Sequence, residues 1–215
     1  MKKKPRAAVF DCDGLLLDTE DCWTLGEKEL FAAYGLEFTP EHKRRLLGTS
    51  SEAAGRVLAE LLDRPGEEER LAAERLERCW EKVVRGARPR PGAAELLERL
   101  RGRIPVGLAS NSPRALVLEA LETAGVDGFD AIVGGDEVRK PKPAAEIYTT
   151  ACERLGISPG DSVALEDSPV GVAAARAAGL YVIGVPSQPG IALDADMVAD
   201  SLRHPKVWSR LGAGG

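Results

Sequence analysis

The sequence predicts an α/β fold in which a doubly wound (Rossmann-like) parallel sheet forms the core and a helical segment is inserted after its first strand. Short apolar runs recur and are separated by amphipathic segments, which is typical of parallel strands joined by helices. Between the first two runs the chain has helical periodicity and no strand pattern. The predicted strands are residues 6–10, 104–110, 131–135, 162–166 and 181–186, with a weaker sixth candidate at 196–202.

The segment after the first strand is unusually long. A doubly wound sheet normally joins its first two strands through one helix, whereas residues 18–85 have the pattern of about four. We expect this segment to form a separate helical unit above the first strand, with residues 1–17 and 86–215 forming the core. The stretch RGARPRPG (85–92) is typical of an exposed and stiff return linker.

Core helices are predicted between the later strands. Leucines in residues 91–102 fall on one helical face, and residues 143–156 begin at proline and stop at glycine, as helix termini prefer. Further helices are expected after the second strand, near Pro113, and after the fourth, from Ser168 to Gly179.

Composition excludes several classes of function. The net charge of −5 comes with no basic face that would indicate nucleic-acid or membrane-surface binding, and no apolar run is long enough to span a bilayer. Four cysteines without metal-ligand spacing are typical of reduced thiols, so we expect a cytoplasmic protein. With two histidines in the chain, chemistry that needs a histidine base is poorly supplied.

Polar residues follow four of the predicted strands. Asp11 and Asp13 end the first apolar run, and Gly14 lets the chain turn away. In an extended chain residues two apart point to the same side, so both carboxylates can face one point. They can hold a divalent cation, or act as a nucleophile and a proton donor.

The other strand ends supply complementary groups: Ser110-Asn111-Ser112 after the second, RKPKP (139–143) after the third and Glu166-Asp167 after the fourth. Because ligands of parallel sheets bind at the carboxyl ends of the strands, we expect these groups to share one site. Ser110 can also cap the following helix, and a helix N-terminus suits a phosphate. The prolines can hold one of the two lysines inward, and buried acids need such a cation.

These residue types suit phosphoryl transfer. Asp11, with an ordinary pKa of about 3.9, is ionised and can attack phosphorus to form an aspartyl-phosphate. Magnesium would screen the repulsion between Asp11 and the substrate. Asp13, if its pKa is raised, would protonate the leaving group and later accept a proton from water. Ser110 and nearby N–H groups would hold the phosphoryl oxygens, and Lys140 would offset the remaining charge.

The chain resembles the haloacid dehalogenase (HAD) superfamily, in the phosphatase and β-phosphoglucomutase-like branch with an α-helical cap. FDCDGLLLDTE, LASNS, RKPKP and LEDSPVG resemble its four motifs, in order, across essentially the whole chain. The resemblance implies that Asp11 is the nucleophile, Asp13 the general acid/base and Lys140 the motif lysine. It implies Mg²⁺ held by Asp11, the backbone carbonyl of Asp13 and Asp167, with Glu166 as a helper.

Two departures favour a phosphatase over a sugar phosphomutase. Trp23 stands where mutases of this family carry a histidine, and in the loop LLGTSSE Ser51 stands where they carry an arginine. The residues expected to face the substrate are Ser110, Asn111, Trp23, Gly48, Thr49 and Ser50. Trp23 fits the core of the helical unit equally well. Arg44 and Arg45 can contact a remote anion, although exposure is the expected state of both.

Two readings outside this class stay open. A phospho-accepting receiver domain uses similar groups but has no helical insertion, and a catalytically silent phosphate-binding module would not need the intact acids. The substrate is expected to be a small phosphorylated metabolite. Hexose phosphates, deoxy-sugar phosphates, phosphoglycolate and nucleotides all remain possible, and so does any oligomeric state.

Overall fold

A parallel sheet occupies the centre of the core in the computed structural model, which describes residues 4–188 and 190–213. Its six strands lie in the order β3-β2-β1-β4-β5-β6, so β1 is central. In register, Val9 pairs with Gly107 on one side and with Ala164 on the other. The doubly wound α/β prediction is confirmed, including the weak sixth strand. The strands are β1 (Ala7–Phe10), β2 (Val106–Ala109), β3 (Ala131–Val133), β4 (Ser162–Glu166), β5 (Tyr181–Gly184) and β6 (Met197–Val198).

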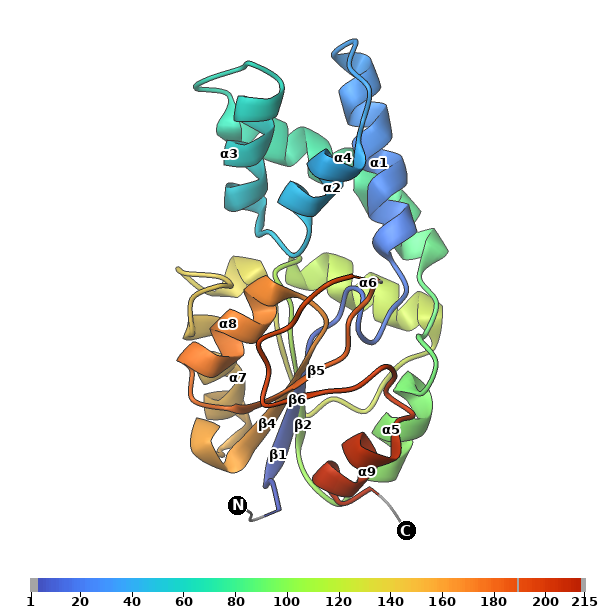
Figure 1. Cartoon of the computed structure of the whole chain (residues 1–215), viewed down its shortest axis with the longest axis vertical. Coiled ribbons are helices and arrows are strands. Elements are labelled where there is room, and N and C mark those ends of the chain that lie inside the picture. Colours follow the sequence, from blue (N-terminus) through green and yellow to red (C-terminus); the bar gives the residue numbers. More distant parts are fainter. Residues whose placement is uncertain (1–3, 189, 214–215) are drawn as a thin grey trace.

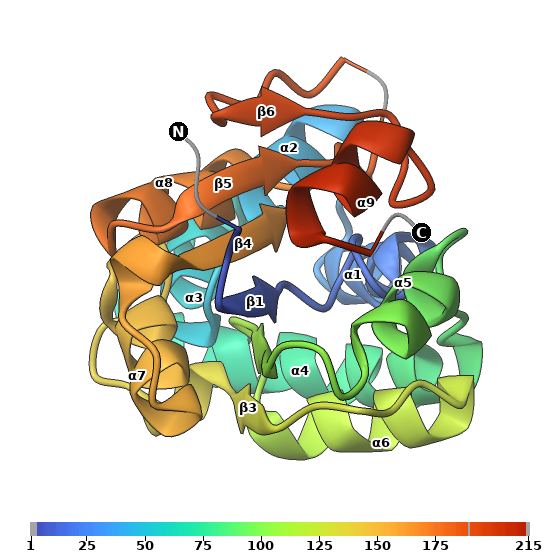
Figure 2. The ribbon, with the colours of Figure 1, turned by 90° about the horizontal axis from the view of Figure 1, so that it is seen from below.

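Helices cover both faces of this sheet (Figure 2). On one face Val9 and Ala164 pack with α7 (Glu146–Leu155) and α8 (Pro169–Ala177). On the other face Phe10 and Leu165 pack with α5 (Ala93–Leu100), α6 (Arg114–Ala124) and α9 (Pro205–Leu211). Successive strand residues therefore face opposite layers, and the sheet is buried on both sides. Two short 3-10 helices, η1 (Gly135–Glu137) and η2 (Pro159–Asp161), complete the core.

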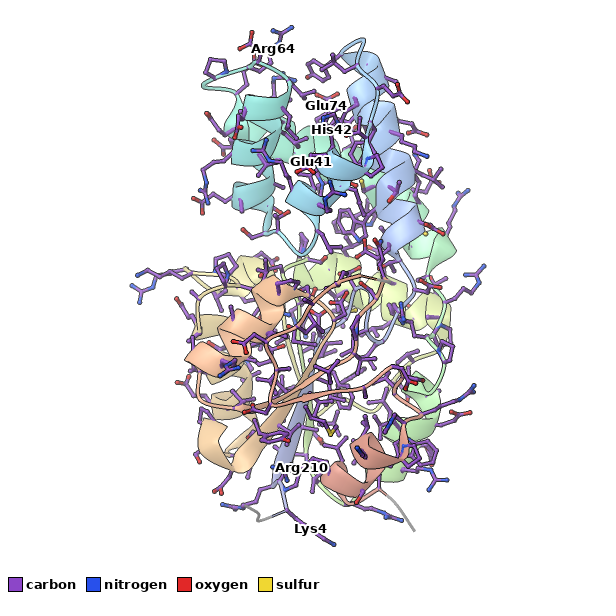
Figure 3. The ribbon with its side chains drawn as sticks, in the orientation of Figure 1. Lys4, Glu41, His42, Arg64, Glu74 and Arg210 are labelled. Carbon is purple, nitrogen blue, oxygen red and sulfur yellow. The ribbon has the colours of Figure 1, made fainter. Side chains whose placement is uncertain are left out.

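A helical insertion follows β1 and lies beyond the carboxyl ends of the strands (Figure 1). It consists of α1 (Glu20–Ala33), α2 (Pro40–Leu46), α3 (Ser51–Leu61) and α4 (Glu68–Gly86). Its apolar side chains form a cluster of their own, with Leu30, Phe31 and Leu58 fully buried. In Figure 3 the labelled Arg64 lies at the far tip of this insertion, whereas Lys4 and Arg210 lie at the opposite end of the molecule.

The outgoing and returning chains of the insertion run side by side. The N–H of Asp18 donates to the carbonyl of Arg88 at 2.8 Å, and the N–H of Arg90 donates to that of Leu16 at 2.8 Å. Leu17 and Pro89 form an antiparallel bridge between these bonds. Within the described part of the chain, no helix combines the length and the apolar character that crossing a bilayer requires.

Candidate active site

A pocket lies between the strand ends and the helical insertion. The core lines it with residues that follow β1, β2, β3 and β4, and the insertion lines it from α1, α2, the 47–51 segment and α4. The predicted convergence of polar strand ends on one site is therefore what the structure shows. The core residues that line the pocket are Asp11, Asp13, Ser110, Asn111, Ser112, Pro113, Lys142, Asp167 and Ser168.

Asp11 lies directly after β1 and is nearly buried, with 7% of its surface exposed. Its Oδ1 accepts a hydrogen bond of 2.5 Å from Nζ of Lys142. Burial raises the pKa of Asp11 to about 7, Lys142 opposes this rise, and the charge of Glu166 adds to it. The carboxyl group is therefore held in place by one cation, and further positive charge would favour its ionised form.

The lysine of the site is Lys142, and the prediction of Lys140 for this position is wrong. Nζ of Lys142 is buried between Asp11 and Oε1 of Glu166, at 2.6 Å from the latter, whereas Lys140 is exposed. The backbone explains the difference, because the N–H of Lys140 donates to the Glu146 carboxylate at 3.1 Å, at the start of α7. Although burial lowers the pKa of Lys142, Asp11 and Glu166 raise it above its usual value.

Glu166, the last residue of β4, is completely buried and engaged by the protein. Besides Lys142, the hydroxyl of Tyr148 donates to its Oε1 at 2.6 Å, and Oγ of Ser168 donates to its Oε2 at 3.4 Å. Gly171 of α8 leaves room for this carboxylate, since a Cβ at that position would collide with it. Tyr148 was missed in the sequence, where it is indistinguishable from an ordinary apolar position of α7.

Three carboxylates form a cluster of possible metal ligands. One oxygen each of Asp11, Glu166 and Asp167 lies within 4.8 Å of the others. Burial raises the pKa of Asp167 well above its usual value, and the charges of Asp11 and Glu166 raise it further. Gly14, with a φ of 80°, lies against Asp167, where a Cβ would collide with the carboxylate. An all-oxygen set of this kind fits Mg²⁺.

Asp13 accepts hydrogen bonds from several donors, none of which binds Asp11. Oδ1 accepts from Oγ1 of Thr19 at 2.7 Å and from Nε1 of Trp23 at 3.0 Å. Oδ2 accepts from Oγ of Ser112 at 2.8 Å and from Oγ of Ser110 at 3.4 Å. The carboxyl group of Asp13 is thus separate from the carboxylate cluster. Thr19 was missed, although it lies within the first motif quoted above, and Ser112 was expected near the site but not as a partner of Asp13.

The two residues after β2 have different surroundings. Ser110 is buried in the pocket wall, accepts the N–H of Ser112 at 3.0 Å and does not cap α6, which begins at Arg114. Asn111 turns its amide towards the protein: Nδ2 donates to the carbonyls of Gly48 at 2.9 Å and of Lys142 at 3.2 Å. The two donors of Asn111 are thereby used, which disfavours the predicted role of its side chain in binding substrate.

The insertion contributes Gly48 and Thr49 to the pocket, as predicted, but not the side chain of Ser50. Ser50 is buried and caps α3, where its Oγ accepts the N–H of Ala53 at 3.3 Å. Ser51 lines the pocket instead. A serine directly before a helix is a good cap, and this local bond turns Ser50 away from the pocket. Trp23 lines the pocket, as expected, and is 7% exposed, but it packs in the apolar cluster of the sheet core and not in the separate cluster of the insertion.

The half-buried charged side chains of Glu20, Lys43 and Arg75 line the roof of the pocket, and the fully buried Glu27 pairs with the two cations. Lys43 lies 2.9 Å from Glu20 and 3.4 Å from Glu27, and Arg75 lies 2.6 Å from Glu27. The guanidinium of Arg75 stacks 4.6 Å from the ring of Trp23. These four charged residues were missed, because in the sequence they resemble solvated positions of α1, α2 and α4.

The two arginines that the sequence suggested as contacts for a remote anion do not line the pocket. Arg44 is exposed and pairs with Glu41, and Arg45 pairs with Glu60 at 2.5 Å. The cations that the insertion presents to the pocket are therefore Lys43 and Arg75.

Comparison with known proteins decides the family. The family model of the haloacid dehalogenase-like hydrolases matches residues 8–185, which include nearly all of β1, the whole insertion and the residues after β4. The chain belongs to the haloacid dehalogenase-like hydrolases. The resemblance of the four motifs is thereby confirmed.

Relatives of this hydrolase include both phosphatases and a mutase. It is 33% identical over 179 residues to a phosphorylated carbohydrates phosphatase of Thermotoga maritima, covering 81% of this chain and 82% of that protein. It is 34% identical over 205 residues to the β-phosphoglucomutase of Bacillus subtilis, covering 90% and 88%. The crystal structure of CbbY from Rhodobacter sphaeroides in complex with phosphate matches with a TM-score of 0.80 at 30% identity, covering 93% of this chain and 96% of that one.

Proposed function

We propose that this hydrolase is a magnesium-dependent phosphatase that acts on a small phosphorylated metabolite, of the sugar phosphate kind, through an aspartyl-phosphate on Asp11. The observation that carries the proposal is the placement of two carboxyl groups on one pocket. Asp11 is fixed by Lys142, while Asp13 is fixed by hydroxyl and indole donors. One carboxylate is thus placed to attack, and the other to move protons.

The reaction would have two steps. A carboxylate oxygen of Asp11 forms a bond to phosphorus as the bond from phosphorus to the leaving oxygen breaks, and Asp13 gives that oxygen its proton. Asp13 then removes a proton from water, whose oxygen attacks phosphorus, and the bond to Asp11 breaks to release phosphate. The hydrogen bonds from Thr19, Trp23 and Ser112 hold the carboxyl group of Asp13 in place for both steps.

Lys142, Ser110 and the backbone around it would hold the phosphoryl group. Lys142 keeps one oxygen of Asp11 in position, and its charge offsets part of the charge that the substrate brings. Ser110 lies beside Asp13 in the pocket wall, where its hydroxyl can reach a phosphoryl oxygen.

Mg²⁺ would be held by Asp11 and Asp167, together with the backbone carbonyl of Asp13. These two side chains are buried and lie in the carboxylate cluster, where burial and neighbouring negative charges raise both pKa values. When bound, the ion would neutralise negative charge between carboxylate and phosphate. Glu166 is already occupied by Lys142 and Tyr148, so we assign it to orienting that lysine rather than to direct ligation.

The helical insertion would act as a cap that selects the leaving group. Trp23, Leu46 and Leu76 give the roof of the pocket an apolar part, and Glu20, Lys43 and Arg75 give it a charged part. Such a mixed surface suits a ligand that has both carbon skeleton and hydroxyl groups. It would also shield the acyl-phosphate from bulk water.

The test is a panel of phosphorylated metabolites with Mg²⁺, scored separately for phosphate release and for isomer formation. We expect phosphate release as the main reaction, and loss of turnover on p-nitrophenyl phosphate in Asp11→Asn. Isomer formation as the main reaction would instead assign a mutase, which the identity to β-phosphoglucomutase makes the second candidate. Full turnover in Asp11→Asn would refute the mechanism.

A further inference from the structure

Asn111 is the single asparagine in the chain and lies in the wall of the proposed active site. It follows β2 between Ser110 and Ser112, whose hydroxyls both donate to Asp13. The side chain of Asn111 points elsewhere, towards the segment after β3 and the 47–51 segment of the insertion.

Two hydrogen bonds join the amide of Asn111 to the main chain of Lys142. Oδ1 accepts the N–H of Lys142 at 2.9 Å, and Nδ2 donates to the carbonyl of Lys142 at 3.2 Å. A primary amide that binds both main-chain groups of one residue fixes that residue much as a neighbouring strand would. Lys142 has a long and flexible side chain, so the place of its backbone decides whether Nζ reaches Asp11.

A third hydrogen bond joins Asn111 to the insertion. Nδ2 also donates to the carbonyl of Gly48 at 2.9 Å. Gly48 has a φ of 68°, and a Cβ there would come within 3.1 Å of Oγ of Ser168. The insertion therefore approaches the core closely at this point, and the carbonyl that it presents is bound by the same amide that fixes Lys142.

We propose that Asn111 is a positioning residue that couples closure of the helical insertion to the placement of Lys142. With Gly48 docked, the two N–H groups of Asn111 each have a carbonyl partner, so its amide is held in the orientation that fixes Lys142. With Gly48 withdrawn, one donor loses its partner and the amide is free to rotate. The catalytic part of this inference rests on the proposed phosphatase function, whereas the structural part does not.

The test compares Asn111→Ala with Glu119→Ala as the matched control. Glu119 of α6 accepts a hydrogen bond of 3.0 Å from Nε1 of Trp80 in α4. The control thus also removes a bond between insertion and core, but one whose two residues do not line the pocket. Each variant is measured for kcat and KM on p-nitrophenyl phosphate with Mg²⁺, and for amide hydrogen exchange.

In Asn111→Ala we expect kcat to fall by about tenfold to a hundredfold, as for a displaced catalytic group. Exchange should accelerate at residues 46–51 and 140–143 and stay unchanged in β1 and β4. Glu119→Ala should change neither kcat nor exchange at those two segments. If Asn111→Ala folds poorly, Asn111→Asp serves instead, because it keeps an acceptor for the N–H of Lys142 and loses both donors.

The inference is overturned if exchange at both segments stays at the wild-type rate, or if Glu119→Ala reproduces the effects of Asn111→Ala. A wild-type protein that hydrolyses no phosphomonoester would refute the proposed function alone. The exchange measurement would still decide whether Asn111 joins the two segments.

Discussion

Nζ of Lys142 lies 2.5 Å from Oδ1 of Asp11, although 131 positions separate the two residues in the chain. This ion pair is buried, with 3% and 9% of the two side chains exposed. A buried charge without its partner is strongly unfavourable, so each member of the pair depends on the other. The same ammonium also binds Glu166, so that in the described part of the chain Lys142 is the only cation paired with either carboxylate.

Replacing Lys142 should therefore affect both turnover and folding. We expect Lys142→Met to lower kcat/KM on p-nitrophenyl phosphate by at least about a hundredfold, because a charge that faces the reacting group is lost. It should also lower the melting temperature, since Asp11 and Glu166 lose their shared cation. Lys140→Met is the control, and because Lys140 is exposed it should match the wild type in both measurements. The reverse ranking of the two variants would restore Lys140 as the site lysine.

Mg²⁺ should stabilise the protein more at high pH than at low pH. Asp11, with its pKa raised to about 7, and Asp167, also raised, hold protons in the metal-free fold that the unfolded chain releases near its ordinary pKa. Their contribution to stability is therefore fully present at low pH and is lost as the pH rises through the folded pKa values. Mg²⁺ competes with these protons and binds the ionised carboxylates.

The measurement is the rise in melting temperature that MgCl₂ causes at about pH 5 and about pH 8. We expect a clear rise at the higher pH and little at the lower. Asp167→Asn should remove most of the rise at the higher pH. An equal rise at both pH values would show that these carboxylates do not form the magnesium site.

Gly171→Ala should disturb the site through Glu166, from the side of α8. The added Cβ would collide with the carboxylate of Glu166, which is fixed by Lys142 and Tyr148 and has no room to move. We expect a loss of about 1–3 kcal/mol in the free energy of unfolding, as for overpacked cores, and lower turnover. Gly160→Ala is the matched control, because a Cβ there meets no atom within 4 Å. Urea unfolding of both variants checks the difference, and equal midpoints would contradict it.

Trp23→Phe isolates the hydrogen bond from the insertion to Asp13. The change removes Nε1, which donates to Asp13 at 3.0 Å, and keeps a ring for Arg75 to stack on. We expect kcat to fall about fivefold, since one hydrogen bond contributes about 1 kcal/mol. Trp80→Phe removes a similar indole bond, to the exposed Glu119, and should leave kcat unchanged. Equal kcat values for the two variants would argue against any role for the Trp23 indole in positioning Asp13.

The sheet could be predicted from the sequence because short local patterns mark its strands and the helices between them. Alternating apolar runs and glycine-ended helices identify β1 to β5, and the rule that ligands bind at strand ends brings Asp11, Ser110 and Asp167 together. Local sequence patterns could not predict which of the two lysines, Lys140 or Lys142, reaches the site. It depends on Glu146 binding the backbone of Lys140 and on Asn111 binding that of Lys142, and both contacts cross between elements.

The charged residues in the roof of the pocket were harder still to predict from the sequence. Glu20, Lys43 and Arg75 belong to three different helices, and their half-buried positions follow from how α1, α2 and α4 pack. A charged residue on an amphipathic helix is usually solvated, so periodicity alone places all three outside. Ser50 shows the opposite error, because a motif position that suggested substrate contact is used for a local helix cap.

The bridge between Leu17 and Pro89 has an evolutionary consequence. Because the chain leaves the core and re-enters it at neighbouring points, the distance to be spanned by whatever lies between them is short. Segments whose ends are close can be lengthened, shortened or exchanged at little cost in loop-closure entropy. The core with its carboxylates can thus be inherited unchanged while the roof is replaced, so one hydrolytic centre can be passed to descendants that recognise different metabolites.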